Sequence, residues 1–164
     1  MGRMKETIGY ALEKKTILCN GPRTGATGTN VLTLDNGTAF VDQSQTATTF
    51  VYPVSGLHVG DRINRIRIVG GIGAASGNAS TVDADLRRVV GIAGGVTDAS
   101  LSANITQVSV TADTALNSES ATDIDHAVAT AYGYYVLVTI TTAANAANDV
   151  SIVGVEIDVN DKRP

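Results

Sequence analysis

The sequence predicts an all-β fold in which two antiparallel sheets pack into a β-sandwich. Hydrophobic residues make up 43% of the 164 residues, but Ala and Val dominate them, only 4% of all residues are aromatic, and Trp is absent. Small and β-branched side chains suit closely packed sheets better than helix bundles. The 17 glycines, with frequent Thr and Ser, indicate tight turns between short strands. Among sandwiches, a jelly roll is the favoured variant.

The first 45 residues are predicted to form an N-terminal arm or extension. Residues 1–15 have apolar side chains at helical spacing and are the only plausible helix. Residues 20–28 contain three Gly and one Pro, which predicts a loop. Residues 31–34 and 38–41 flank Asn36-Gly37, a pair that favours a tight primed turn, and predict a small hairpin.

From about Thr46 strand follows strand, so residues 46–160 are predicted to form the sandwich domain. Ile63 is out of phase with Ile66 and Ile68, which a β-bulge would reconcile. Residues 113–125 are polar without a period and predict a loop. The predicted strands cover residues 47–52, 61–69, 81–89, 105–112, 134–142 and 150–159.

Composition and charge exclude several classes of function. The net charge of −4 and the pI near 5.0 argue against nucleic-acid binding, which requires a basic face. The single Cys19 cannot form an internal disulfide. The chain has no apolar run of about 20 residues and no signal-peptide core at its start. We therefore expect a soluble protein, made in a cytoplasm, with no membrane partner.

No motif has the context that catalysis or cofactor binding needs. The stretch from Gly71 to Ser76 follows a strand, as in a dinucleotide fingerprint, but no helix comes next, so we expect a hairpin loop. His58 and His126 are the only histidines that could serve as a base, and neither has a Ser or Cys in a recognisable local frame. The sequence therefore indicates no enzyme, no catalytic residue and no cofactor.

Two acidic clusters in the sequence contain residue types that bind metal ions. Asp123, Asp125 and His126 lie together, and Asp83 and Asp85 share one strand face. Neither cluster has the glycine-punctuated spacing of a calcium loop. Solvated acidic surfaces are the preferred interpretation, and no metal is expected.

Arg65 and Arg67 form a basic stripe with three possible roles. The stripe could be a solvated face that pairs with Asp83 and Asp85 across strands, or it could contact an acidic partner subunit. Nucleic-acid binding is disfavoured because aromatic platforms for bases are absent. Partner contact is predicted for the basic residues of the arm and of this stripe: Arg3, Lys5, Lys14, Lys15, Arg23, Arg65 and Arg67.

Strand phrases after Leu57 form a recognisable pattern. They read VGD (59–61), TVDADLRR (81–88), GVTDAS (95–100), ITQVSVTAD (105–113), YYVLVT (134–139) and VGVEI (153–157). About two-thirds of the chain thereby resembles the capsid decoration (cement) proteins of tailed phages and prophages. The resemblance implies a β-sandwich that sits on the capsid surface of a virion as a homotrimer and binds the major capsid protein. The protein would be made in the host cytoplasm, and the arm would clamp neighbouring capsomers.

Two alternatives remain open at the level of the sequence. One is another phage structural component, such as a head-fibre base, a tail module or a minor capsid protein. The other is a carbohydrate-binding β-sandwich module, whose sites stack sugars on exposed aromatic rings. The sequence offers Tyr132, Tyr134 and Tyr135 for that purpose, although core packing would account for some of them.

Overall fold

The computed structural model describes residues 13–19, 23–24, 31–33, 38–42, 44–45, 47–73, 80–110, 114–120, 124–144 and 149–161. Every regular element within these ranges is a β-strand. None of the described residues belongs to a helix long and apolar enough to cross a bilayer.

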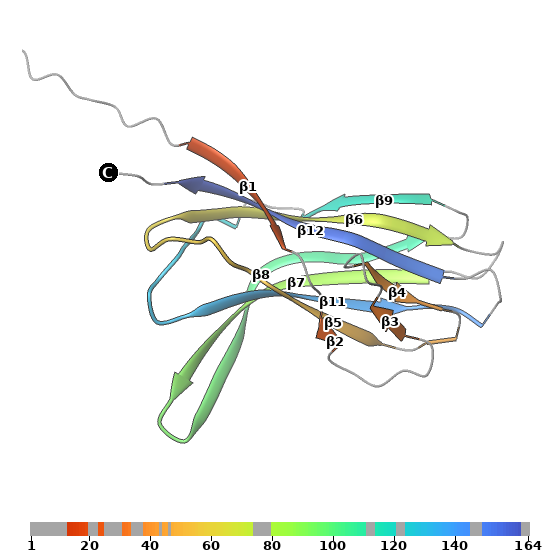
Figure 1. The fold of residues 1–164 in the computed structure, drawn as a ribbon, viewed down its shortest axis with the longest axis horizontal. Coiled ribbons are helices and arrows are strands. Elements are labelled where there is room, and N and C mark those ends of the chain that lie inside the picture. Colours follow the sequence, from red (N-terminus) through yellow and green to blue (C-terminus); the bar gives the residue numbers. More distant parts are fainter. Residues whose placement is uncertain are drawn as a thin grey trace, which may run out of the picture.

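The strands form two antiparallel sheets that pack face to face (Figure 1). Sheet A consists of β1 (Glu13–Cys19), β3 (Val31–Thr33), β4 (Ala39–Val41), β6 (Arg62–Gly73), β9 (Thr114–Glu119), β10 (His126–Ala127) and β12 (Asp149–Asp161). Sheet B consists of β2 (Arg23–Thr24), β5 (Thr48–Pro53), β7 (Ser80–Ile92), β8 (Gly95–Val110) and β11 (Gly133–Thr141). The predicted all-β, antiparallel β-sandwich of the jelly-roll type is confirmed.

In sheet B the strand order is β2-β5-β11-β7-β8, so β11 lies at the centre. Sheet A has the order β10-β6-β12-β4-β3, with β1 also on β12 and β9 also on β6. β6 and β12 therefore form the middle of sheet A, and their residues supply much of the core.

Alternation of side chains builds the core between the sheets. In β11 the side chains of Tyr134, Val136, Val138 and Ile140 are buried, and those between them are partly exposed. β12 buries Ile157 in the same way from sheet A. Each buried Val or Ile stabilises the fold by roughly 1.5–3 kcal/mol relative to an exposed one. The long-range packing of these strands therefore holds the two sheets together.

The predicted bulge near Ile63 is present in β6. Asp158 of β12 pairs with Arg65, whereas the next residue, Val159, pairs with Ile63, so that Asn64 is the extra residue. Because of this extra residue, Ile63 and Ile66 both face the core, and both are fully buried.

Several local predictions are wrong. Gly71 and Gly73 do not lie in a hairpin loop but belong to β6, where Gly71 pairs with Ser151 of β12. The stretch predicted as a loop at 113–125 contains β9, which pairs with β6 and buries Leu116. Residues 13–15 are extended in β1 rather than helical. In each case backbone pairing with a distant strand overrides a weak local pattern.

The described parts of the first 45 residues contribute strands to both sheets. β1 pairs with β12 from Glu13 to Cys19, and β3 pairs with β4 as expected for the small hairpin. Cys19 is only 2% exposed in the core, and this burial raises the pKa of its thiol to about 12. Residues 1–12 lie outside the described residues, and the domain boundary at residue 46 stays a prediction.

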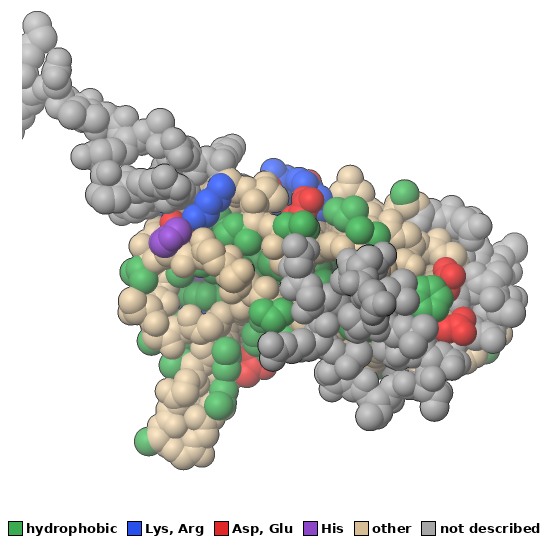
Figure 2. All heavy atoms as spheres, in the orientation of Figure 1, with side chains coloured by type: hydrophobic (Ala, Val, Ile, Leu, Met, Phe, Trp, Pro, Cys, Tyr) green, Lys and Arg blue, Asp and Glu red, His purple; other side chains and the backbone are tan. Residues whose placement is uncertain are grey.

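A hairpin formed by the ends of β7 and β8 projects beyond the sandwich toward the outer side of sheet B (Figures 1 and 2). Between Asp85 and Arg87 of β7, the partner strand passes from Asn104 to Ser100, so β8 is bulged at this point. A bulge bends a strand and increases its twist. The pairing then continues to Ile92 and Gly95, with a positive φ of 89° at Gly94 in the turn.

Because β6 and β12 approach closely at Gly70 but not at Gly71, we expect alanine substitutions at these two glycines to differ in their effect on stability. A Cβ on Gly70 would lie 2.0 Å from the backbone oxygen of Ser151, whereas one on Gly71 would meet nothing within 4 Å. We expect Gly70→Ala to lower the free energy of unfolding by about 1–3 kcal/mol or more, since backbone must move. Gly71→Ala is the matched control and should change it by no more than about 0.5 kcal/mol. Urea unfolding measures both, and equal effects would contradict this account.

Candidate functional site

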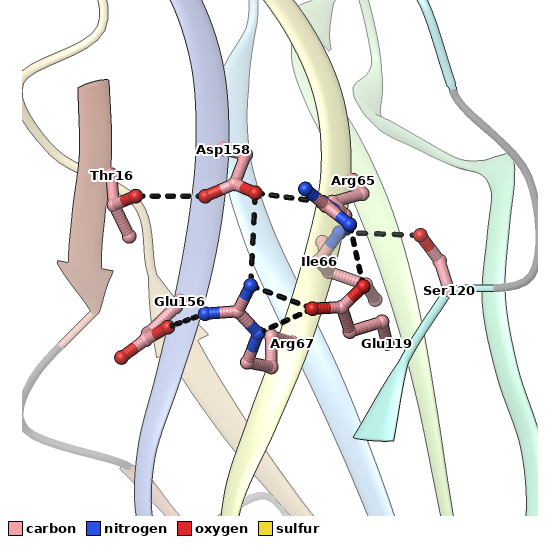
Figure 3. Close-up of polar contacts among 8 residues, drawn as sticks. All are labelled: Thr16, Arg65, Ile66, Arg67, Glu119, Ser120, Glu156 and Asp158. Carbon is pink, nitrogen blue, oxygen red and sulfur yellow. Dashed lines mark hydrogen bonds and ion pairs between the residues drawn. The ribbon is translucent and has the colours of Figure 1, made fainter. Parts of the chain in front are cut away.

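The outer face of sheet A carries a network of ion pairs centred on Arg65 and Arg67 (Figure 3). Arg65 donates to Asp158 at 2.7 Å and also pairs with Glu119. Arg67 pairs with Glu119 at 2.6 Å and with Glu156 at 2.7 Å. The guanidinium groups lower the pKa of Glu119, chiefly through the hydrogen bond from Arg67.

This network changes the interpretation of the basic stripe. Its carboxylates come from β9 and β12, not from Asp83 and Asp85, which lie in sheet B. The sequence-based partner was wrong because β6 and β7 are consecutive in the chain but belong to different sheets. Both guanidinium groups are already neutralised within the sheet, so a partner would have to compete with these ion pairs. A contact of Arg65 and Arg67 with another protein stays a prediction.

Among the other basic residues predicted for partner contact, Lys15 is the one whose side chain the structure describes. Lys15 bonds Asp61 at 2.9 Å and so joins β1 to the loop before β6. Lys14 and Arg23 lie in β1 and β2, and their side chains are not among those described. Arg3 and Lys5 lie outside the described residues. Lys15 and Arg65 line the same hollow of about 530 Å³, and contact of these basic residues with a partner stays a prediction.

A second polar cluster occupies the outer face of sheet B at the base of the projecting hairpin. Arg87 of β7 donates to Asp85 at 2.8 Å, to Asp98 of β8 at 3.1 Å and to the hydroxyl of Tyr135 at 3.2 Å. Ser100 donates to the other carboxylate oxygen of Asp85 at 2.6 Å. We call these five residues the corner site. Three strands meet in it, and hydrogen bonds fix the position of each polar group.

The charges of the corner site are stable at neutral pH. The hydrogen bond from Arg87 lowers the pKa of Asp98, and the same contact is the main reason that the pKa of Arg87 is raised. Partial burial, with the hydrogen bond to Asp98, raises the pKa of the Tyr135 phenol. The site therefore presents a protonated phenol, a guanidinium and carboxylates together, with the Tyr135 side chain partly exposed.

The hairpin continues the face on which the corner site lies. Val96 pairs with Gly91, and Asp98 pairs with Val89, so these residues share the side of the ladder that carries Arg87. Val96 is 68% exposed. Because the hairpin bends toward the outer side of sheet B (Figure 1), this face forms a wall beside the corner site.

Sequence reasoning missed the corner site because it ended the strands too early. Residues 90–95 contain three glycines and resemble a loop, whereas the structure extends β7 to Ile92 and starts β8 at Gly95. One signal was available: a glycine pair between two short apolar segments is a hairpin signature. That hairpin would have placed the strand that carries Asp98 beside the strand that carries Arg87.

The other residues considered from the sequence have structural contacts. His126 is hydrogen bonded to the Tyr134 hydroxyl at 3.2 Å, and burial followed by the charges of Arg88 and Arg62 lowers its pKa. Asp125 is paired with Arg62. Asp123 lies outside the described residues, and within those residues no three His, Cys, Asp or Glu side chains are grouped as a metal site would require.

No family model and no curated protein matches the chain. Among solved structures, the chain is similar to the CBM36-1 domain of a multidomain xylanase from the hindgut metagenome of Trinervitermes trinervoides. The two are 13% identical, the match covers 88% of this chain and 96% of that one, and the TM-score is 0.47. The xylan-binding module CBM86 of Roseburia intestinalis matches at 13% identity over 90% and 96% of the two chains, with a TM-score of 0.48. The xylan-binding module CBM15 matches at 15% identity over 92% and 100%, with a TM-score of 0.46.

These similarities concern the fold, but they correct the family predicted from the strand phrases. The matched structures are carbohydrate-binding modules and not phage proteins. The prediction of a capsid decoration protein, with the major capsid protein and a homotrimer as partners, is therefore wrong. The error arose because β-branched residues that alternate with polar ones suit a half-exposed strand of any sandwich and do not identify a family. The expectation that the chain is not an enzyme stays a prediction.

Asp61 generates a prediction about acid stability. Its carboxylate is 1% exposed and accepts hydrogen bonds from the His58 backbone N–H and the Lys15 ammonium, both at 2.9 Å. Burial alone would raise the pKa of Asp61, but these contacts outweigh it and the pKa lies below its ordinary value. The stabilisation is thus present above about pH 4 and is lost as pH falls through the folded-state pKa.

We expect Asp61→Asn to reduce the free energy of unfolding by about 1–3 kcal/mol at pH 7 and by clearly less at pH 3. Urea unfolding at both pH values measures the difference. Glu156→Gln is the control in a more exposed ion pair and should cost less than about 1 kcal/mol at either pH. An Asp61→Asn effect that does not change with pH would contradict the conclusion that the ionised carboxylate of Asp61 stabilises the fold.

Proposed function

We propose that this chain is a non-catalytic carbohydrate-binding module that holds a glycan at the corner site. The observation that supports it is the cluster around Tyr135, in which an aromatic ring lies among fixed hydrogen-bonding groups. A sugar has an apolar C–H face and a rim of hydroxyl groups, so it requires both kinds of contact.

The corner site can supply these contacts in defined roles. The Tyr135 ring provides a surface for the C–H face of a sugar. The carboxylates of Asp85 and Asp98 accept hydrogen bonds from hydroxyl groups, and the guanidinium of Arg87 donates them. The hydrogen bonds within the cluster already order these side chains, so less conformational entropy is lost when a ligand binds.

The charge of the site favours a neutral glycan. Two carboxylates of the cluster face one guanidinium, and Asp83 lies further along the same face of β7. A polymer of sugar acids would meet net negative charge there. Neutral hydroxyl groups avoid this repulsion, so we expect neutral oligosaccharides to bind and polygalacturonate not to bind.

Tyr135→Ala tests the role of the ring. We expect about tenfold or greater loss of affinity for the best binder among xylohexaose, cellohexaose and mannohexaose, because the stacking surface is removed. Isothermal titration calorimetry measures the affinity. Tyr135→Phe keeps the ring and should stay within about threefold of the original protein. Arg65→Gln on the opposite sheet is a further control and should have no effect. Failure of all three oligosaccharides to bind, or equal binding by Tyr135→Ala, would refute the proposal.

The wall formed by the hairpin is tested by two exposed apolar residues on its opposite faces. Val96 is 68% exposed on the face of the corner site, and Ile92 is 56% exposed on the other face. We expect Val96→Asp to weaken the same oligosaccharide about fivefold or more, since it adds charge and removes apolar contact beside the site. Ile92→Asp is the matched control and should leave the affinity unchanged. Equal effects of the two changes would show that the wall does not contact the glycan.

A further inference from the structure

A hollow of about 280 Å³ lies at the end of the sandwich, on the other side of the hairpin base from the corner site. Two loops form it, one before β6 and one before β11. The side chains that line it are mainly apolar and include Val54, Leu57, Val59, Val128 and Tyr132, and polar atoms are exposed beside them. Pockets for larger ligands usually measure about 300–1,000 Å³. This hollow is therefore suited to a small molecule with a single ring.

Tyr132 and Tyr134 contribute aromatic rings to this hollow. Their ring centroids are 6.5 Å apart, and the rings are tilted at 59°. The hydroxyl of Tyr134 already accepts the N–H of Ala129 at 3.1 Å and contacts His126. The Tyr134 ring is only 7% exposed, whereas the Tyr132 ring is partly exposed, so a ligand in the hollow would contact mainly Tyr132.

Arg88 lies beside this hollow and differs from the other described arginines. Its guanidinium carbon is 4.6 Å from the centroid of the Tyr132 ring. Arg62, Arg65, Arg67 and Arg87 are all paired with carboxylates. Among the arginines whose side chains the structure describes, Arg88 is the one without an ion pair. Its planar fork of donors fits a carboxylate through two parallel hydrogen bonds.

We propose that this hollow binds a small carboxylic acid with one aromatic ring, the ring against Tyr132 and the carboxylate on Arg88. One unpaired guanidinium balances one negative charge, so a monoanion fits better than a dianionic phosphate. The apolar side chains of Val54, Leu57 and Val59 favour an aromatic ring over a sugar acid, whose hydroxyl groups would lose hydrogen bonds to water against them. The site lies on the opposite face of β7 from the corner site and does not depend on the proposed function.

The test uses the full chain with phenylacetate, its neutral analogue phenylacetamide and glucuronate as probes. Binding is followed by calorimetry and by the chemical shifts of the Tyr132 and Tyr134 rings. We expect phenylacetate to shift both rings and to bind about tenfold more tightly than phenylacetamide, with glucuronate weaker than phenylacetate. Absence of phenylacetate binding, equal binding of the amide, or tighter binding of glucuronate would each overturn the proposal.

Variants separate the carboxylate contact from a general effect on folding. Arg88→Gln should reduce phenylacetate affinity about tenfold, to the level of phenylacetamide, while phenylacetamide binding stays within about twofold. Arg62→Gln removes a nearby arginine that is already paired with Asp125 and should leave phenylacetate binding within about twofold. Thermal unfolding checks that both variants are folded. An unchanged affinity in Arg88→Gln would overturn the assignment of the carboxylate to Arg88.

Discussion

Leu86 is the last side chain of β7 that the sandwich buries, but the ladder between β7 and β8 continues to Ile92 and Gly95. Side chains of a strand alternate between its two faces whether or not a second sheet covers them. Beyond Leu86, the outer face therefore presents Arg87 at the corner site, and the inner face presents Arg88 beside the apolar hollow. Both candidate sites depend on this continued pairing past the end of the core.

The two outer faces of the sandwich use charge in different ways. On sheet A, guanidinium and carboxylate groups of β6, β9 and β12 pair with one another. On sheet B, the cluster at Arg87 includes a partly exposed tyrosine and lies against a projecting wall. Fixed polar groups beside an aromatic ring are typical of binding sites, whereas a network of charges that pair with one another is typical of a solvated sheet face.

The sequence predicted those features of the fold that depend on alternation over many residues. The strands around Val136 and Ile157 and the bulge near Ile63 were predicted correctly, because buried residues on a central strand leave a clear period of two. β9 was missed because it buries only one described side chain, Leu116, and is held by backbone pairing with β6. The partners of Arg65 were missed because contacts between strands distant in sequence leave no local pattern. The hairpin was missed because its tip has no core to face.

The burial of Cys19 allows the opening of β1, a strand of sheet A, to be followed in solution. Its side chain is 2% exposed, and only a thiolate reacts readily with alkylating reagents. With the pKa of the thiol raised to about 12, the folded strand contains almost no reactive form at neutral pH. Labelling of Cys19 requires β1 to separate from β12, so the labelling rate reports the local opening of this strand without an added probe. The single cysteine thus allows opening of the N-terminal strand to be timed separately from unfolding of the whole sandwich.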